Sequence, residues 1–164
     1  MGFEGSYLWQ LRQTVGNRLL LMPGAQVVVV DAEERVLFQR RQDSGQWEFP
    51  AGAAEPGMTF RDTAVQELHE ESGLRVDPES LVPFATLSDP AVHLITYPNG
   101  DQVHCFALCF EARTWTGDLS PGADEVQEAS FFNPDDLPEP LQPQTKVVWD
   151  LYRAFRATGV FQAR

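Results

Sequence analysis

Lysine is almost missing from this 164-residue sequence, which contains only Lys146. Lysine and arginine together number 12 against 24 aspartates and glutamates, so the net charge is −12. Because binding a nucleic-acid backbone requires clustered cations, this balance argues against a nucleic-acid polymer as the partner. The remaining basic residues are arginines, whose planar guanidinium suits bidentate contacts with individual phosphates.

Long apolar runs and cysteines are also scarce. No run of 18 apolar residues and no charged-then-apolar leader is present, which argues against a membrane span and a signal peptide. The two cysteines, Cys105 and Cys109, lie four apart in an expected strand, so both point to one face but too far apart for a disulfide. We expect reduced core thiols and, by default, a cytoplasmic protein. The three histidines show no paired metal-ligand spacing.

The most informative segment is residues 52–74, where a glycine-containing loop leads into a long stretch without glycine or proline. That stretch covers residues 59–72 and is followed by Gly73, the residue type expected just past a helix end. The pattern predicts a helix of about four turns.

Three glutamates share one side of this predicted helix. At roughly 100° per residue, Glu67, Glu70 and Glu71 project within an arc of about 100°. Like charges this close repel unless a cation lies between them. One interpretation is a solvated acidic face. The other is a site for a hard divalent cation such as Mg²⁺, which prefers carboxylate oxygens and often shares its coordination sphere with substrate phosphates.

Loop and helix together resemble the Nudix box, in which glycine, glutamate, arginine and aliphatic residues recur at fixed spacing. Seven of the nine defined positions match, namely Gly52, Glu67, Leu68, Glu70, Glu71, Gly73 and Leu74. The preceding segment from Trp47 to Ala51 looks like the family's usual lead-in. The resemblance implies an α/β fold, a single-domain α/β/α sandwich with a mixed sheet between helices. It also implies a hydrolase that uses Mg²⁺ or Mn²⁺ to cleave nucleoside diphosphates linked to another group.

Two positions depart from the family pattern. Met58 stands where the family has its first glutamate, and Gln66 stands where it has arginine. Losing both is physically coherent, because a lone charge left in a partly buried place costs several kcal/mol. The departures put the orientation of Glu67 and Glu70 in question, since losing a supporting partner typically costs about 10- to 100-fold in metal affinity or activity.

The resemblance also implies roles for individual residues. The metal would be bound by Glu67, Glu70, Glu71 and the carbonyl oxygen of Gly52, and water would attack phosphorus. Glu70 or Glu125 would accept the proton of that water. Glu125 belongs to an acidic segment, residues 124–132, that resembles a region contributing such a glutamate in many family members.

Substrate-binding residues are expected around the box. The adjacent Arg40 and Arg41 are candidates for holding a diphosphate, with a solvated pair at a strand end as the alternative. Trp47 or Phe131 would stack on a base, against the alternative that both pack in the core.

Periodicity predicts the elements and a division of the chain into three parts. We expect helices over residues 6–14 and 144–156, a turn at Pro23 and Gly24, and a hairpin turn over residues 98–101. Strands are expected over residues 25–30, 36–39, 81–87, 93–97 and 103–112, with residues 36–39 returning beside residues 25–30. The predicted parts are a helical segment with a turn (1–24), a Nudix hydrolase domain (25–158) and a tail (159–164).

Function is therefore predicted with an alternative. The first hypothesis is a metal-dependent pyrophosphohydrolase acting on a nucleotide sugar, ADP-ribose, a dinucleotide or a nucleoside triphosphate. The second is a non-catalytic nucleotide-binding domain that acts as a sensor or interaction module, because Met58 and Gln66 replace charged residues. Homodimerisation through residues 2–21 is a further possibility, and a simple packed helix explains that segment equally well.

Overall fold

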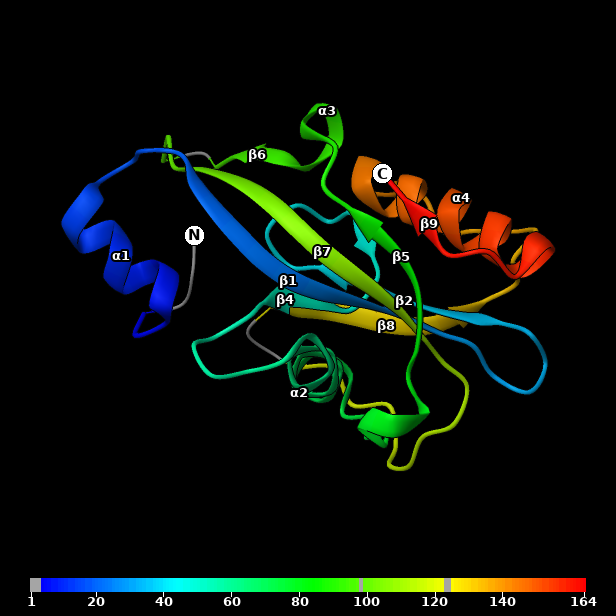
Figure 1. The fold of residues 1–164 in the computed structure, drawn as a ribbon. Helices are drawn as coiled ribbons and strands as arrows, with labels where there is room; N and C mark the ends of the chain where they lie inside the picture. The colour runs from blue at the N-terminus through cyan, green and yellow to red at the C-terminus, as the bar shows by residue number, and fades with distance from the viewer. Residues whose placement is uncertain (1–3, 98, 123–124) are drawn as a thin grey trace.

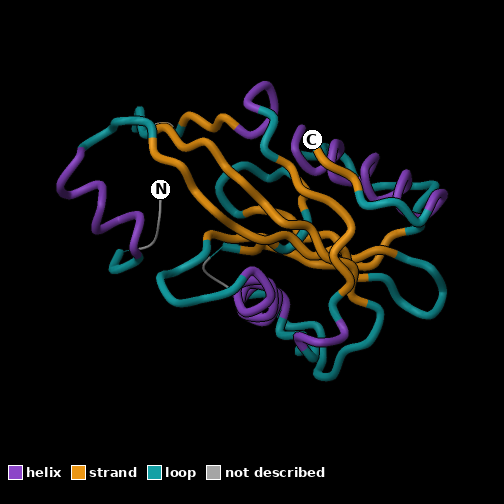
Figure 2. Tube along the Cα trace, viewed as in Figure 1, coloured by secondary structure: helices purple, strands orange, loops and turns teal. Residues whose placement is uncertain are grey.

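Helices cover both faces of a β-sheet, as Figures 1 and 2 show. The computed structural model describes residues 4–97, 99–122 and 125–164. Helix α2 (Phe60–Ser72) packs on one face and helix α4 (Pro143–Thr158) on the other. The remaining helical elements are α1 (Tyr7–Val15), the 3-10 turn η1 (Pro78–Ser80) and α3 (Pro90–His93). None of the helices in the described part of the chain is long and apolar enough to cross a membrane.

The strands form two sheets. A six-stranded sheet has the order β4-β1-β7-β5-β9, with β6 paired to β7, and a three-stranded sheet has the order β3-β2-β8. Pairing of β1 with β7 and of β5 with β9 is parallel, whereas the other pairs are antiparallel. The strands are β1 (Leu20–Val29), β2 (Val36–Arg41), β3 (Trp47–Glu48), β4 (Ala51–Ala53), β5 (Val82–Leu87), β6 (Leu94–Thr96), β7 (Gln102–Ala112), β8 (Val126–Phe132) and β9 (Gln162–Ala163).

Strand β2 corrects one prediction. It was expected to return beside the first strand. Among the described residues, β1 and β2 meet only at an isolated bridge between Val30 and Val36, and β2 pairs instead with β3 and β8. The reason is that β1 already has β7 along its whole length and β4 on its other edge. The returning chain therefore starts a second sheet.

A second correction concerns the start of β1. Pro23 and Gly24 lie inside this strand rather than in a turn, because parallel pairing with β7 begins at Leu20 and continues through both residues. Gly24 faces the carbonyl oxygen of Gly52 so closely that an added Cβ would lie 2.5 Å from it. The predicted turn that closed the 1–24 segment is thus wrong, while the three-part division itself stays a prediction.

Two apolar clusters hold the layers together. The cluster beneath α4 includes Val28, Phe38 and Trp149, and the cluster beneath α2 includes Val27, Leu37 and Leu68. Successive residues of β1 and β2 thus point to opposite faces, as strand geometry requires. Both cysteines are buried and unpaired as predicted, and burial raises the pKa of each thiol to about 12.

The ends of the chain are tied to the sheet. Residues of the predicted tail form β9, which pairs with β5, and Arg164 adds an ion pair with Asp89. At the other end, α1 is capped by Ser6, and Arg12 donates to the carbonyl oxygen of Gln102. Helix α1 lies at the side of the molecule (Figure 1). Dimerisation through residues 2–21 stays a prediction. Residues 1–3, 98 and 124, which belong to predicted segments, lie outside the described residues.

Candidate active site on helix α2

Helix α2 has well-formed ends. Thr59 is its N-cap, and the capping box is reciprocal, because the Thr59 hydroxyl accepts from the Asp62 N–H while the Asp62 carboxylate accepts from the Thr59 N–H. Gly73 adopts a left-handed conformation (φ 78°) and donates to the carbonyl oxygen of His69. These local signals place the three glutamates as the sequence predicted.

The loop after β7 closes over the C-terminal end of α2 and brings Glu125 to the site. Its backbone N–H groups at Ser120 and Gly122 donate to the carbonyl oxygens of Ser72 and Glu71. The carbonyl oxygen of Glu125 accepts from the N–H of Gln42 at 2.8 Å. A surface cleft of about 530 Å³ adjoins this segment and is lined by Gln42, Pro121, Val126 and Gln127.

The carboxylate of Glu67 lies directly against Gly52. A Cβ atom at position 52 would be 2.0 Å from the Glu67 carboxyl carbon and 2.2 to 2.3 Å from its oxygens. Glycine at position 52 therefore leaves the space that the Glu67 carboxylate occupies, and any side chain there would displace that carboxylate.

Negative charge accumulates around Glu67. Burial is the largest cause that raises its pKa, and the carboxylates of Glu70, Glu125 and Glu55 add to it; together they raise the pKa of Glu67 to about 7. Glu70, Glu125 and Glu55 thus lie close enough to Glu67 for their charges to act on it, while the roles predicted for these residues stay predictions. Glu55 also accepts the backbone N–H of Tyr7, which links the box loop to the start of α1.

Glu71 occupies a different, more buried environment. It is 4% exposed, and one of its oxygens accepts the backbone N–H of Ala51 at 2.9 Å. Burial raises its pKa well above the usual range, and the nearby carboxylate of Glu48 raises it further, whereas hydrogen bonds from Gln39 and Ala51 lower it. Burial also raises the pKa of Glu48, although Arg41 opposes the shift.

The two departures from the box pattern have structural consequences that differ. Gln66 is exposed, and its amide donates to a carboxylate oxygen of Glu70 at 2.8 Å, so Glu70 keeps a bracing hydrogen bond. Met58 contributes a backbone N–H to the carbonyl oxygen of Glu55 in the box loop.

The donor set suits a hard divalent cation. Within the described ranges, no three His, Cys, Asp or Glu side chains are gathered as a ready-made metal site, because Glu70 is turned to Gln66 and Glu71 to Ala51. Nevertheless, carboxylate oxygens are the ligands that Mg²⁺ prefers. Burial is the main cause of the raised pKa of Glu67, and the neighbouring carboxylates add to it; a bound cation would relieve their repulsion.

Comparison with known proteins supports this description. A family profile described as "NUDIX domain" matches residues 20–155. The chain belongs to the NUDIX domain family. An ADP-ribose pyrophosphatase of Methanocaldococcus jannaschii is 28% identical over 140 residues, which cover 83% of this chain and 77% of that protein. The NAD-capped RNA hydrolase NudC of Pseudomonas syringae is 31% identical over 133 residues; these cover 80% of this chain but only 43% of that longer protein.

Solved structures agree on the fold. The MutT NUDIX hydrolase from Burkholderia pseudomallei superposes with a TM-score of 0.68 at 20% identity, covering 80% of this chain and 98% of that chain. The predicted single-domain α/β fold is confirmed, as is the assignment to the Nudix-type pyrophosphohydrolases.

The two arginines predicted to hold a diphosphate have separate surroundings in this Nudix domain. Arg41 binds both oxygens of Asp43 at 2.8 Å and also contacts Glu48 at 3.1 Å, so its guanidinium is occupied by protein carboxylates. Arg40 donates through Nε to the carbonyl oxygen of Gly45 at 3.0 Å. Arg40 remains the better placed of the two for a phosphate.

The two aromatic residues predicted to stack on a base both contact other rings. Trp47 is 6% exposed and packs edge-on against Phe132 in the cluster beneath α4. Phe131 stacks on Trp115 with ring centroids 5.6 Å apart, on the side of the sheet that α2 covers. These placements favour the packing alternative, and the substrate role of either ring stays a prediction.

Three residues of the site were not predicted as such, namely Gln39, Glu48 and Glu55. Gln39 and Glu48 are polar residues within apolar segments that become β2 and β3, and both are buried. A polar residue in a buried strand normally has a specific partner, so that signal was available in the sequence. Glu55 carried no such signal, because a glutamate in a loop is usually solvated.

Proposed function

We propose that this protein is a metal-dependent pyrophosphohydrolase that cleaves the diphosphate bond of a nucleoside diphosphate linked to another group. The observation that carries the proposal is the Glu67 carboxylate held against Gly52, where burial and three further carboxylates raise its pKa to about 7. A purely solvated acidic helix face has no need for this close packing. The substrate class follows from family relatives such as the M. jannaschii ADP-ribose pyrophosphatase.

Each residue has a proposed task. Glu67, Glu70, Glu71 and the carbonyl oxygen of Gly52 would hold Mg²⁺ or Mn²⁺. The bound cation would supply neutralisation of charge on the phosphate oxygens and acidification of water. Glu70 or Glu125 would accept the proton of the water that attacks phosphorus. The diphosphate bond would then break to give a nucleoside monophosphate and the phosphorylated form of the other group.

A small nucleotide fits the charge of the chain better than a polymer does. A net charge of −12 repels nucleic-acid backbones, so any RNA substrate would have to be engaged through its 5′ end alone. A cytoplasmic location would supply such nucleotides together with Mg²⁺. The cytoplasmic location and the use of Mg²⁺ are both parts of this proposal.

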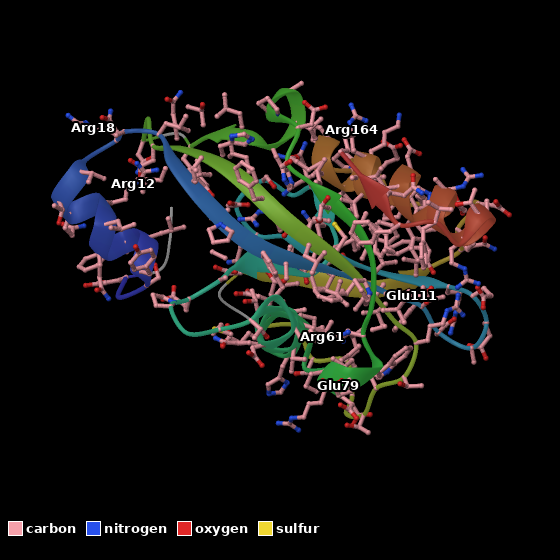
Figure 3. All side chains as sticks on the ribbon, viewed as in Figure 1. Arg12, Arg18, Arg61, Glu79, Glu111 and Arg164 are labelled. Atoms are coloured by element: carbon pink, nitrogen blue, oxygen red, sulfur yellow. The ribbon has the colours of Figure 1, made fainter. Side chains whose placement is uncertain are left out.

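The test is release of nucleoside monophosphate from a panel containing ADP-ribose, nucleotide sugars, dinucleoside polyphosphates, nucleoside triphosphates and a capped RNA, with Mg²⁺ and with Mn²⁺. We expect metal-dependent turnover that falls at least a hundredfold in Glu70→Gln and Glu71→Gln. Glu79→Gln is the matched control, because Glu79 lies in η1 at the periphery of the molecule (Figure 3) and is exposed. Metal-dependent nucleotide binding without turnover on any substrate would instead support the sensor.

A further inference from the structure

A second cleft lies on the side of the molecule that carries α4. It has a volume of about 390 Å³ and is bounded by the turn between β1 and β2, the last turns of α4 and the segment that follows β8. This volume falls within the range of about 300–1,000 Å³ that small-molecule sites occupy. Figure 1 shows the C-terminal end of α4 near that turn, whereas the box helix α2 covers the opposite face. The cleft is therefore separate from the candidate active site.

Arg156 is held in a fixed orientation at this cleft. Its Nη1 atom donates to a carboxylate oxygen of Glu111 at 2.8 Å and to the Tyr152 hydroxyl at 3.4 Å. Glu111, on β7 (Figure 3), and Tyr152 are both buried and hydrogen-bond to each other. Within the described ranges, the Nε and Nη2 atoms of Arg156 have no hydrogen-bond or ion-pair partner. That edge of a guanidinium can receive a carboxylate or phosphate through two parallel hydrogen bonds.

Arg153 supplies a second cation one turn earlier in α4. A spacing of three residues places it on the same side of the helix as Arg156, and both line the cleft. Its side chain is exposed and forms no hydrogen bond or ion pair with the residues that the structure describes. Of the two acids in the lining, Glu34 is already bound by both terminal nitrogens of Arg113 at 2.7 and 3.0 Å, and Asp135 is exposed. Cationic donors thus remain available to an anion.

The rest of the lining is mainly apolar. Val30 and Val36, which form an isolated bridge, contribute to it together with Pro134 and the ring of Trp149. Trp149 is 6% exposed and packs against Phe49 in the cluster beneath α4, so its ring has a fixed position. Apolar walls with a few oriented polar groups are typical of sites for small organic ligands.

We propose that this cleft is a second ligand site, which binds a small organic anion through Arg153 and Arg156 and holds the apolar body of that anion beside Trp149. The charged end of the ligand is a carboxylate or a phosphate. Because Glu111 and Tyr152 already orient Arg156, little side-chain freedom is lost on binding. The site goes beyond the proposed hydrolysis, and its occupation requires no divalent cation.

The probe is phenyl phosphate, titrated into the full chain with EDTA present, so that no divalent cation can hold a phosphate at the candidate active site. The readouts are the ¹H–¹⁵N chemical shifts of the Trp149 indole N–H and the Arg156 Nε–H. We expect saturable shifts of both groups, and also with benzoate, which carries a carboxylate instead. Inorganic phosphate and benzyl alcohol each lack one half of the ligand and should bind at least tenfold more weakly.

Arg153→Gln is the decisive variant, because Arg153 is exposed and its loss leaves the contacts between Arg156 and Glu111 in place. The dissociation constant for phenyl phosphate should rise at least tenfold, as expected for the loss of a charged donor. Arg156→Lys keeps the charge but removes the planar fork, and it should also weaken binding. Arg164→Gln is the matched control, because it removes one positive charge away from the cleft, beside Asp89 (Figure 3). It should bind phenyl phosphate as the wild type does.

Three results would overturn this second site. The first is the absence of a saturable shift of the Trp149 indole, and the second is equal affinity of Arg153→Gln and the wild type. The third is a set of shifts confined to the amides of Gly52 and Glu67, which would place the probe at the box helix. Equal affinity for inorganic phosphate and phenyl phosphate would overturn the requirement for an apolar body. None of these measurements depends on turnover, so failure of the second site and failure of the proposed hydrolysis are distinguishable.

Discussion

The close packing of Glu67 on Gly52 makes a specific prediction for Gly52→Ala. The new methyl group would lie 2.0 Å from the Glu67 carboxyl carbon, whereas ordinary contacts are 3.4 Å or longer. The backbone of Gly52 does not have a positive φ, so alanine fits the main chain and the conflict is confined to the side chain. Glu67 must therefore rotate away.

The size of the effect differs between stability and activity. Rotating one glutamate to another conformation costs about 1 kcal/mol at most, and moving it toward solvent relieves repulsion from its neighbours, so the free energy of unfolding should change by less than about 1 kcal/mol. Activity depends on the exact position of the ligand, and a displacement of about 1 Å typically costs about 100-fold. We expect kcat/KM to fall at least a hundredfold.

Gly24→Ala provides the comparison. Its Cβ would lie 2.5 Å from the backbone carbonyl oxygen of Gly52, which cannot rotate away as a side chain can. We expect a loss of about 1–3 kcal/mol in stability from this overpacking. Urea unfolding and Mg²⁺-dependent turnover of both variants test the reasoning. Wild-type turnover by Gly52→Ala, or a stability loss equal to that of Gly24→Ala, would refute it.

Three further predictions follow from the site. The free energy of unfolding of the metal-free protein should fall as pH rises from about 4.5 to about 7, because native Glu67 stays protonated while the unfolded chain ionises. The raised pKa corresponds to at most about 3 kcal/mol. Glu67→Gln should reduce the slope in urea unfolding at pH 5 and 8, and the slope that remains is expected from buried Glu71. An unchanged slope would contradict this. Gln66→Ala removes the hydrogen bond to Glu70 and should lower kcat/KM and Mn²⁺ affinity about tenfold, while the free energy of unfolding changes by less than about 0.5 kcal/mol. Wild-type kcat/KM and Mn²⁺ affinity would show that this hydrogen bond is dispensable. Arg41→Ala should lower the free energy of unfolding by about 3 kcal/mol, because buried Glu48 loses its cation. Arg40→Ala should mainly raise KM. Equal losses of stability in the two variants would contradict these different roles.

The box helix was predictable because its signals are local. Thr59 and Gly73 mark its ends by capping and by a left-handed conformation, and both act within one turn of the helix. Once the ends are known, the 3.6-residue period fixes which glutamates share a side. No information about the rest of the fold was needed.

The sheets were only partly predictable because strand pairing is not local. Residues 25–30 and 36–39 were correctly predicted as strands, but nothing near them reveals that β7 and β4 take both edges of β1. That competition sends β2 into a second sheet. It also brings Gln39 opposite Glu48, so the hydrogen bond between these two buried side chains became visible only in three dimensions.

The two departures from the Nudix box conserve the charge of the site. Replacing a glutamate by Met58 and an arginine by Gln66 removes one negative and one positive charge, so the net charge around Glu67 is unchanged. Gln66 also keeps a donor on Glu70 at 2.8 Å, which an arginine would have supplied with a formal charge. The negative potential that attracts a divalent cation is therefore retained, together with the hydrogen bond that directs Glu70. A domain that had lost metal binding would need neither, so the joint replacement argues that the site still binds a divalent cation. Turnover then separates the hydrolase from a sensor that binds nucleotide through the same cation.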